Sequence, residues 1–266
     1  MAQTGGAESQ ITLHGFWTTY SSWTARVVLV LEYFKIPYKA NYYNIFDPAQ
    51  RPTDERFNGR LYPMLQPHDE DPDFLVEESL AICEYLADRY PDHGLWPRDA
   101  KLRALARAAA AQMHAGFGEM RNTYHTNFVA KYTGKIPVSE AAANEIRKMV
   151  GIWSGARAHT KKRLQELGEE DEGFLFGAFS IADAFFWPVL WRFRSYQLPM
   201  DGISDDGLAW MATMWNHPVM KAQAHDYFEQ RKDPSIYVDK YENLFKGNAE
   251  VHFDQFDEDW EFSPHT

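Results

Sequence analysis

The sequence predicts two domains in series, an α/β domain followed by an all-helical one. Up to about residue 92, short apolar runs typical of strands alternate with amphipathic helical stretches, whereas beyond Pro97 apolar residues recur only at helical spacing. The length of 266 residues fits two domains of ordinary size. We expect the α/β domain at residues 11–92, the helical domain at 98–246 and a C-terminal tail at 247–266.

The first half of the α/β domain reads as a strand, a helix and a second strand. Ile11–Trp17 forms the first strand, and the apolar stretch Ala25–Phe34 forms a helix that Pro37 helps to end. Tyr38–Ile45 gives the second strand, and a short helix is expected at Thr53–Phe57.

The second half reads as a hairpin and a helix. Met64–Gln66 and Phe74–Val76 are apolar pieces separated by Pro67 and an acidic turn, a pattern typical of a hairpin. From Ser79 onward, Ile82, Cys83, Leu86 and Tyr90 recur at helical spacing. The order βαβ–α–ββ–α is, in outline, that of the thioredoxin-like fold.

The helical domain is expected to contain one long helix from Leu102 to Met120 and another over Ser139–Glu166. The segment 180–183 (SIAD) resembles a capping box, in which a serine hydroxyl and a carboxylate satisfy free backbone donors at a helix start. Its helix runs through Pro188 to Arg194, so a kink is expected. Shorter helices are expected near 208–215 and 218–229, which completes an all-α helical bundle.

The tail from residue 247 alternates acidic and aromatic residues and cannot form a core by itself. Two interpretations remain open: a mobile acidic tail, or a tail packed over the domain surface or the mouth of an active site.

Composition and charge argue against several classes of binding partner. The formal net charge of -11 argues against binding to nucleic acid or to an anionic membrane. No apolar run approaches the roughly 20 residues that cross a bilayer, and the first ten residues lack the features of a secretory signal. The single cysteine, Cys83, cannot form an internal disulfide and is expected to be a buried structural thiol, so a reducing, cytoplasmic location is expected.

The sequence lacks the motifs of two further classes of site, metal sites and nucleotide-binding sites. The histidines show no paired spacing that would indicate a metal site, and no glycine-rich phosphate loop appears. We therefore expect neither a bound metal nor a nucleotide.

The turn between the first strand and the first helix contains candidate catalytic residues. Backbone N–H groups at a helix start are unsatisfied and favour an anion, and the hydroxyl of Ser21 or Ser22 could donate to a bound thiolate. A free thiol has a pKa of about 8.5, and lowering it by two units requires about 2.7 kcal/mol. A serine in this place is equally typical of an ordinary N-cap.

Two more features could bind a peptide-like ligand. Proline in Tyr62-Pro63 opens a strand, and a cis bond there would expose the Tyr62 backbone, although most such bonds are trans. Glu78 and Ser79 begin the next helix, where they could receive a ligand's ammonium and carboxylate or simply start the helix.

In combination these motifs resemble a known family. The segment 20–26 (YSSWTAR), Tyr62-Pro63 and the segment 78–86 (ESLAICEYL) resemble the N-terminal half of serine-type, zeta-like glutathione transferases, the group that contains maleylacetoacetate isomerase. In the C-terminal half, 111–121 (AQMHAGFGEMR) and 174–183 (FLFGAFSIAD) with 192–196 (RFRSY) are similar to that family's helical domain.

The resemblance implies glutathione as co-substrate and a homodimer. It implies that Ser21 bonds the glutathione sulfur, with Ser22 as the nearest competitor, and that the Tyr62 backbone at cis-Pro63 pairs with the cysteinyl part. Glu78 and Ser79 would hold the γ-glutamyl end. The expected wall for a small hydrophobic electrophile consists of Trp23, His114, Phe117 and Arg121, with Arg121 alternatively holding a carboxylate.

Three functions follow from the resemblance: conjugation of glutathione to an apolar electrophile, glutathione-dependent cis–trans isomerisation, and non-catalytic binding. The retained serines favour catalysis. The chain departs from the family in having Leu61 two residues before Pro63, which puts the binding of the glycyl end in doubt. No cysteine occupies the catalytic position, which argues against the omega and beta types.

Overall fold

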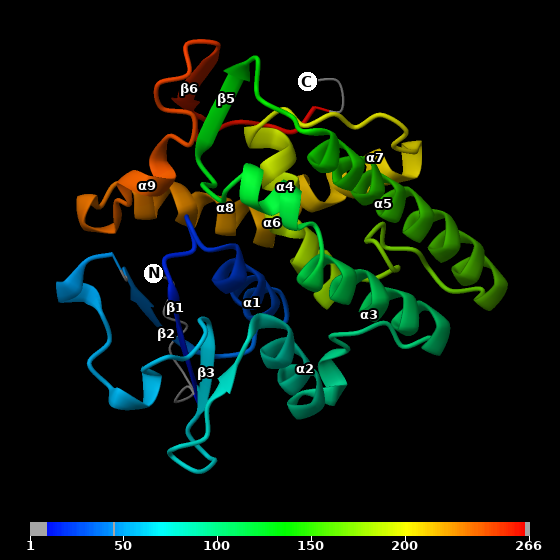
Figure 1. Ribbon diagram of the computed structural model, residues 1–266. Helices are drawn as coiled ribbons and strands as arrows, with labels where there is room; N and C mark the ends of the chain where they lie inside the picture. The colour runs from blue at the N-terminus through cyan, green and yellow to red at the C-terminus, as the bar shows by residue number, and fades with distance from the viewer. Residues whose placement is uncertain (1–9, 45, 264–266) are drawn as a thin grey trace.

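The computed structural model describes residues 10–44 and 46–263. The first nine residues, Ile45 and the last three residues lie outside this range. Figure 1 shows the α/β part beside a larger helical part, in chain order.

A four-stranded mixed sheet forms the centre of the N-terminal domain. The strands β1 (Ile11–Phe16), β2 (Lys39–Tyr43), β3 (Met64–Pro67) and β4 (Val76–Glu77) lie in the order β2-β1-β3-β4. Strand β1 pairs parallel with β2 and antiparallel with β3, and β3 and β4 form the predicted hairpin. Short 3₁₀ helices occur at Pro48–Gln50, Glu55–Phe57 and Pro91–His93. The predicted thioredoxin-like fold is confirmed.

Helices α1 (Ser22–Tyr33) and α2 (Ser79–Arg89) belong to this domain. Helix α1 begins three residues earlier than predicted, and its central residues 27–31 are all buried because it packs against α2, α6 and α8 as well as beside the sheet. Cys83 on α2 is buried, as expected, and burial raises the pKa of its thiol. The first helix therefore joins the cores of the two domains.

The helical domain is built around α6. Its helices are α3 (Ala100–Ala115), α4 (Gly118–Thr123), α5 (Glu140–Leu167), α6 (Ile181–Ser195), α7 (Asp205–Asn216) and α8 (Pro218–Arg231). Every residue of α6 except Arg194 is buried, and the helix continues through Pro188. The predicted capping box is present: the buried Asp183 carboxylate accepts from the backbone N–H and hydroxyl of Ser180.

The predicted single helix from Leu102 to Met120 is wrong, because the chain breaks between α3 and α4. Gly116 ends α3, and Phe117 adopts a left-handed conformation with φ 59°. A Cβ at Gly116 would lie 2.8 Å from the Gln112 carbonyl oxygen, so glycine permits this close approach. The break directs α4 toward the first turn of α1.

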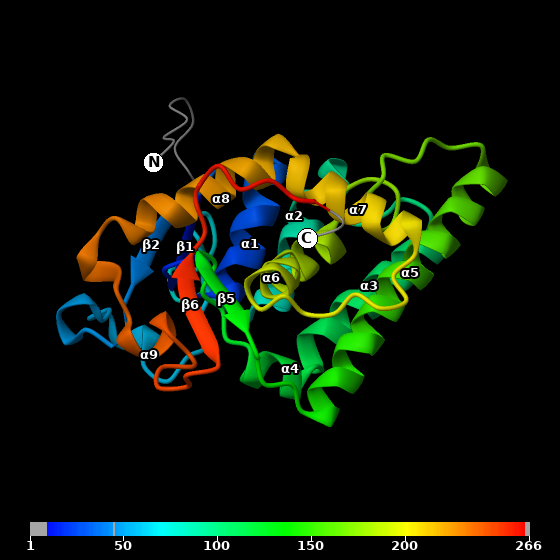
Figure 2. The same ribbon diagram turned by 90° about the horizontal axis from the view of Figure 1, so that it is seen from above.

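The expectation that only helices follow Pro97 is also wrong. Strand β5 (Ala130–Gly134) pairs antiparallel with β6 (Val251–Gln255), which belongs to the tail. A 3₁₀ turn at Pro234–Ile236 and the short helix α9 (Asp239–Glu242) connect α8 to this ribbon. Beyond β6 the chain runs across the helical domain toward α7 (Figure 2), where the rings of Trp260 and Trp215 lie 5.0 Å apart.

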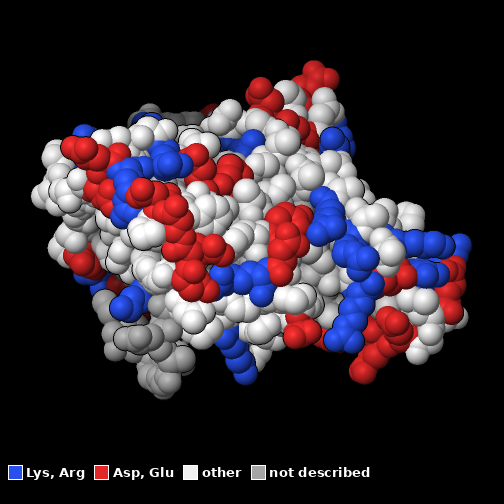
Figure 3. All heavy atoms as spheres, turned by 90° about the horizontal axis from the view of Figure 1, so that it is seen from below, with Lys and Arg blue, Asp and Glu red and all other residues white. Residues whose placement is uncertain are grey.

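The surface carries both signs of charge. On the face seen from below, acidic and basic side chains are interspersed (Figure 3). Among the described residues, no helix is long and apolar enough to cross a bilayer.

Candidate active site

The turn that starts α1 places two serines at the helix N-terminus. Ser21 is the N-cap: its Oγ accepts from the Thr24 N–H at 3.2 Å and lies 3.0 Å from the Thr24 hydroxyl. Ser21 and Ser22 are each 7% exposed, so both hydroxyls are nearly buried but retain access to one side. The first turn of α1 contains no acidic residue that would compete for an anion at this helix end.

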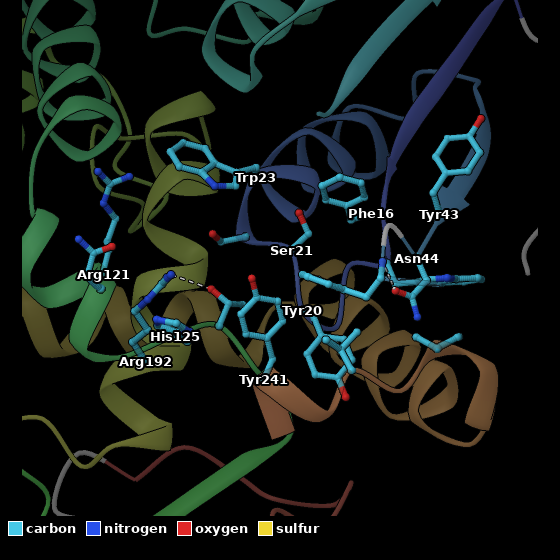
Figure 4. Close-up of a pocket in the computed structure, with 17 residues that line it drawn as sticks. Phe16, Tyr20, Ser21, Trp23, Tyr43, Asn44, Arg121, His125, Arg192 and Tyr241 are labelled. Atoms are coloured by element: carbon cyan, nitrogen blue, oxygen red, sulfur yellow. Dashed lines mark hydrogen bonds between the residues drawn. The ribbon is translucent and has the colours of Figure 1, made fainter. Parts of the chain in front are cut away.

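A cavity of about 500 Å³ opens in front of this turn, between the two domains. Figure 4 shows Ser21 near its centre, with Trp23 on one side and Tyr20 on the other. The lining residues are Phe16, Trp17, Tyr20, Ser21, Ser22, Trp23, Tyr43, Asn44, Phe46, Arg121, Asn122, His125, Thr126, Arg192, Ile236, Val238 and Tyr241. Its size lies within the range of small-molecule sites, and aromatic side chains form much of its wall.

Four of the sequence-predicted residues line this cavity: Ser21, Ser22, Trp23 and Arg121. Tyr62 lies just behind the lining, with its ring centroid 4.7 Å from that of Phe16 and 6.0 Å from that of Tyr43. The Tyr62-Pro63 peptide bond is cis.

Glu78, Ser79 and His114 lie together outside the cavity lining. Glu78 is the N-cap of α2 with φ 82°, and its carboxylate lies 2.9 Å from Nε2 of His114. The Glu78 side chain is 35% exposed, whereas Ser79 is fully buried and its hydroxyl has no hydrogen-bond partner among the described residues. The His114 ring also lies 5.6 Å from that of Trp23 and so connects this pair to the cavity wall.

Phe117 does not line the cavity. Its side chain is 5% exposed and lies under Lys148, whose ammonium is 5.4 Å from the ring centroid. Phe117 therefore packs within the helical domain at the break between α3 and α4.

On the cationic side of the cavity, sequence reasoning found Arg121 but missed Arg192. Arg192 is buried, and it donates to the Tyr124 carbonyl and to the Thr126 hydroxyl. Burial, helped by Arg121, lowers the pKa of Arg192 to about 10. The sequence offered one signal, since Arg192 belongs to the quoted segment 192–196, but that segment carried no assigned role.

A second buried arginine lies behind Trp23. The guanidinium of Arg26 is 4.7 Å from the ring centroids of both Trp23 and Phe185, and two of its nitrogens have no partner among the described residues. Burial and the positive charges of Arg192 and Arg121 lower the pKa of Arg26 to about 9. This side of the cavity thus has a positive potential, although the chain as a whole is acidic.

Sequence reasoning also did not assign Tyr20, Phe46, Asn122, His125 and Thr126 to the cavity. Two further groups of missed residues complete the lining. Phe16, Trp17, Tyr43 and Asn44 lie at the ends of β1 and β2, where the parallel pair meets the turn before α1. Ile236, Val238 and Tyr241 lie beyond α8, in a segment for which the sequence predicted no element. The high aromatic content of the sequence was the only signal, and it applies only to Phe16, Trp17, Tyr43 and Tyr241.

This arrangement suits a nucleophilic anion at the α1 N-terminus and an apolar, aromatic-sized group in the adjoining cavity. Hydroxyl and backbone donors stabilise the anion, and the arginines add positive potential at the opposite side. A transferase whose nucleophile is an anion, such as a thiolate, would require a site of this kind.

Comparison with known families identifies the chain more closely. The family model for the glutathione S-transferase N-terminal domain matches residues 20–89, and the model for the C-terminal domain of the same family matches 137–214. Together the two models cover more than half of the chain. The protein belongs to the glutathione S-transferase family.

Individual relatives agree with this assignment. The chain is 30% identical over 128 residues to maleylacetoacetate isomerase of Dictyostelium discoideum, covering 48% of this chain and 57% of that protein. It is 36% identical over 100 residues to a glutathione S-transferase of Triticum aestivum, covering 37% and 43% respectively. The matches thus span about half the length of these relatives.

The fold is shared with solved structures. A glutathione transferase homologue from Burkholderia, solved with bound glutathione, superposes with a TM-score of 0.56 at 24% identity. The match covers 84% of this chain and 98% of that one.

Proposed function

We propose that the protein is an enzyme that activates glutathione and transfers its sulfur to an apolar electrophile. The observation that carries this proposal is the hydroxyl of Ser21 at the N-terminus of α1, beside a largely aromatic cavity of about 500 Å³. Relatives named maleylacetoacetate isomerase and glutathione S-transferase support the same chemistry.

In the proposed reaction, Ser21 donates a hydrogen bond to the glutathione thiolate, and the α1 N-terminus adds its partial positive charge. The thiolate attacks an electrophilic carbon, so a sulfur–carbon bond forms while a leaving group departs with its electron pair or, in an addition, the adjacent carbon takes up a proton. The cavity holds the electrophile next to the sulfur, which supplies orientation. The step requires no metal.

Glutathione would extend from Ser21 toward α2. The Tyr62 backbone pairs with its cysteinyl part at cis-Pro63, and Glu78 with Ser79 holds the γ-glutamyl end. The partly exposed Glu78 carboxylate supports this placement, since it can accept from an ammonium group. His114, which contacts Glu78 in the structure, would then share this carboxylate with the ligand.

Replacing the two serines separately tests the proposal. We expect Ser21→Ala to lower kcat/KM for glutathione and 1-chloro-2,4-dinitrobenzene by on the order of 10²-fold, because one charge-assisted hydrogen bond is worth about 1.5–3 kcal/mol. Ser22→Ala is the matched control and should retain most activity. If Ser22→Ala alone removes activity, the role belongs to Ser22. If neither change lowers the activity, neither serine has this role. A native protein that binds glutathione but shows no turnover would be a non-catalytic binding protein.

A second candidate function is glutathione-dependent cis–trans isomerisation of an unsaturated acid. The observation that favours it is Arg121: its guanidinium lines the cavity, and its buried Nε has no hydrogen-bond partner among the described residues. Arg121 would hold the substrate carboxylate while the thiolate adds to the double bond and leaves again after rotation. Turnover of maleylacetoacetate that Arg121→Gln abolishes, with dinitrobenzene conjugation retained, would establish this function.

We also propose that the protein works as a homodimer in the cytoplasm. Leu105 on α3 and Phe74 beside β4 are large apolar side chains left 41% and 40% exposed, which suits a contact with a second copy. A cell compartment that keeps thiols reduced suits a glutathione-dependent enzyme. Sedimentation of the native chain and of Leu105→Glu tests the dimer: a monomer in both proteins would contradict it.

A further inference from the structure

Part of the cavity wall comes from a segment that lies outside the residues matched by the two domain models. Ile236 and Val238 line the cavity and are nearly buried, and Tyr241 lies beside them on α9. These residues follow α8, more than twenty residues beyond the end of the matched C-terminal model. In Figure 4, Trp23 lies above Ser21 and Tyr241 lies below it.

The ring of Tyr241 meets side chains from both domains. Its centroid lies 6.3 Å from that of Tyr20 in the turn before α1 and 5.7 Å from that of Phe46 after β2. On the other side it lies 5.6 Å from His125 of the helical domain. Tyr241 therefore closes the gap between the domains where the cavity would otherwise open.

Glu242 fixes this wall in place. Its carboxylate accepts from Arg231 at 2.6 Å and from the Tyr20 hydroxyl at 2.9 Å, and Gln255 of β6 donates to it at 3.0 Å. The Arg231 and Glu242 side chains are only 10% and 12% exposed, so their ion pair is largely shielded from water. The Tyr20 hydroxyl is thus committed to the wall and not to the sulfur of a bound thiol.

Hydrogen bonds at both ends of the wall join it to the two domains. The side chains of Asn44 and Gln50 in the α/β domain donate to the Ser235 carbonyl at 3.3 and 2.8 Å. In the helical domain, the Asn127 amide donates to the Tyr241 carbonyl at 3.2 Å. These hydrogen bonds hold the segment against both domains, so it is a fixed part of the cavity wall.

We propose that residues 234–242, the distal wall, select the electrophile through the three side chains that line the cavity, those of Ile236, Val238 and Tyr241, with Tyr241 as the principal specificity-determining residue. This inference rests on the proposed function and assigns the selection of the electrophile to a segment beyond the matched C-terminal model. The side chains of Ile236, Val238 and Tyr241 are apolar or aromatic, so the favoured sulfur substituent is an uncharged alkyl or aryl group that fills the space between Ser21 and Tyr241.

The test compares binding of glutathione with binding of S-hexylglutathione, whose hexyl chain serves as the probe of the wall. We expect Tyr241→Ala to weaken S-hexylglutathione by on the order of tenfold, because an aromatic surface is lost. Glutathione itself should bind within about twofold of the native protein, since its contacts lie at Ser21 and α2. Calorimetric titration measures both.

Tyr237→Ala is the matched control, because Tyr237 belongs to the same segment but is 45% exposed and does not line the cavity. It should change neither affinity. Unchanged S-hexylglutathione binding in Tyr241→Ala, an equal loss for glutathione, or the same loss in Tyr237→Ala would each overturn the inference.

A second probe separates this inference from the proposed function. The dye 1-anilinonaphthalene-8-sulfonate should bind in the cavity of the native protein, and Tyr241→Ala should weaken this binding. Both results are expected whether or not the protein binds glutathione. Native protein that fails to bind glutathione overturns the proposed function, whereas dye binding that is unchanged by Tyr241→Ala overturns the role of the distal wall.

Discussion

At the scale of residues, one buried carboxylate collects hydrogen bonds from several parts of the helical domain. Asp183 lies in the interior, and burial raises the pKa of its carboxyl even though four donors reach it. Two of these come from Ser180, and the others are the Leu175 N–H and the Trp210 indole at 2.9 Å each. The capping box was predictable from 180–183, but the contacts from distant residues depend on tertiary packing.

Asp183→Ala should therefore destabilise the protein strongly. Because several buried donors lose their acceptor at once, we expect the free energy of unfolding to fall by about 3–5 kcal/mol, measured by urea denaturation. Asp206→Asn on α7 is the control, since its exposed pair with Lys161 should contribute less than about 1 kcal/mol. A loss as small as in the control would contradict the structural role of Asp183.

At the scale of elements, the sequence predicted those helices and strands whose positions depend on local sequence patterns. The strands β1 to β3, helix α2 and helix α5 follow from apolar periodicity and caps, such as Ser139, whose hydroxyl accepts from the Ala142 N–H at 3.1 Å. The ribbon β5–β6 could not be found this way, because its strands pair across more than a hundred residues. The break at Gly116 was missed because the apolar spacing continues through it.

Removing the ion pair between Arg231 and Glu242 should make the distal wall more mobile than the rest of the fold. Glu242→Gln leaves Arg231 without a charged partner, so amide hydrogen exchange in residues 234–242 should accelerate by on the order of tenfold or more. Exchange in α6 should stay unchanged. Glu229→Gln, which removes an exposed pair with Lys232 on α8, is the control. Equal protection of the wall in both variants would show that Glu242 does not fix it.

At the scale of the whole molecule, burial makes stability depend on pH. Burial lowers the pKa of His14, His114, His125 and His217, so the folded state resists protonation at each. Below about pH 6.5 the unfolded chain binds protons that the folded chain does not, and the free energy of unfolding therefore decreases as the pH falls.

His125→Gln isolates one of these contributions. The stability of the native protein relative to this variant should fall as the pH is lowered through 6.5, by at most about 1.4 kcal/mol per pH unit. Other titrating groups cancel in the comparison. A difference that stays constant between about pH 7.5 and 5.5, or that changes with the opposite sign, would rule out this coupling.

We propose that Ser21 at the α1 N-terminus stabilises the glutathione thiolate. The most direct measurement is the pKa of bound glutathione, obtained by titrating the thiolate's ultraviolet absorbance in the complex. We expect a pKa about two units below the free value of about 8.5 in the native protein. In Ser21→Ala the pKa should return largely toward the free value, and in Ser22→Ala it should stay as low as in the native protein. A bound thiol that titrates like free glutathione, or a lowered pKa that survives Ser21→Ala, would contradict it.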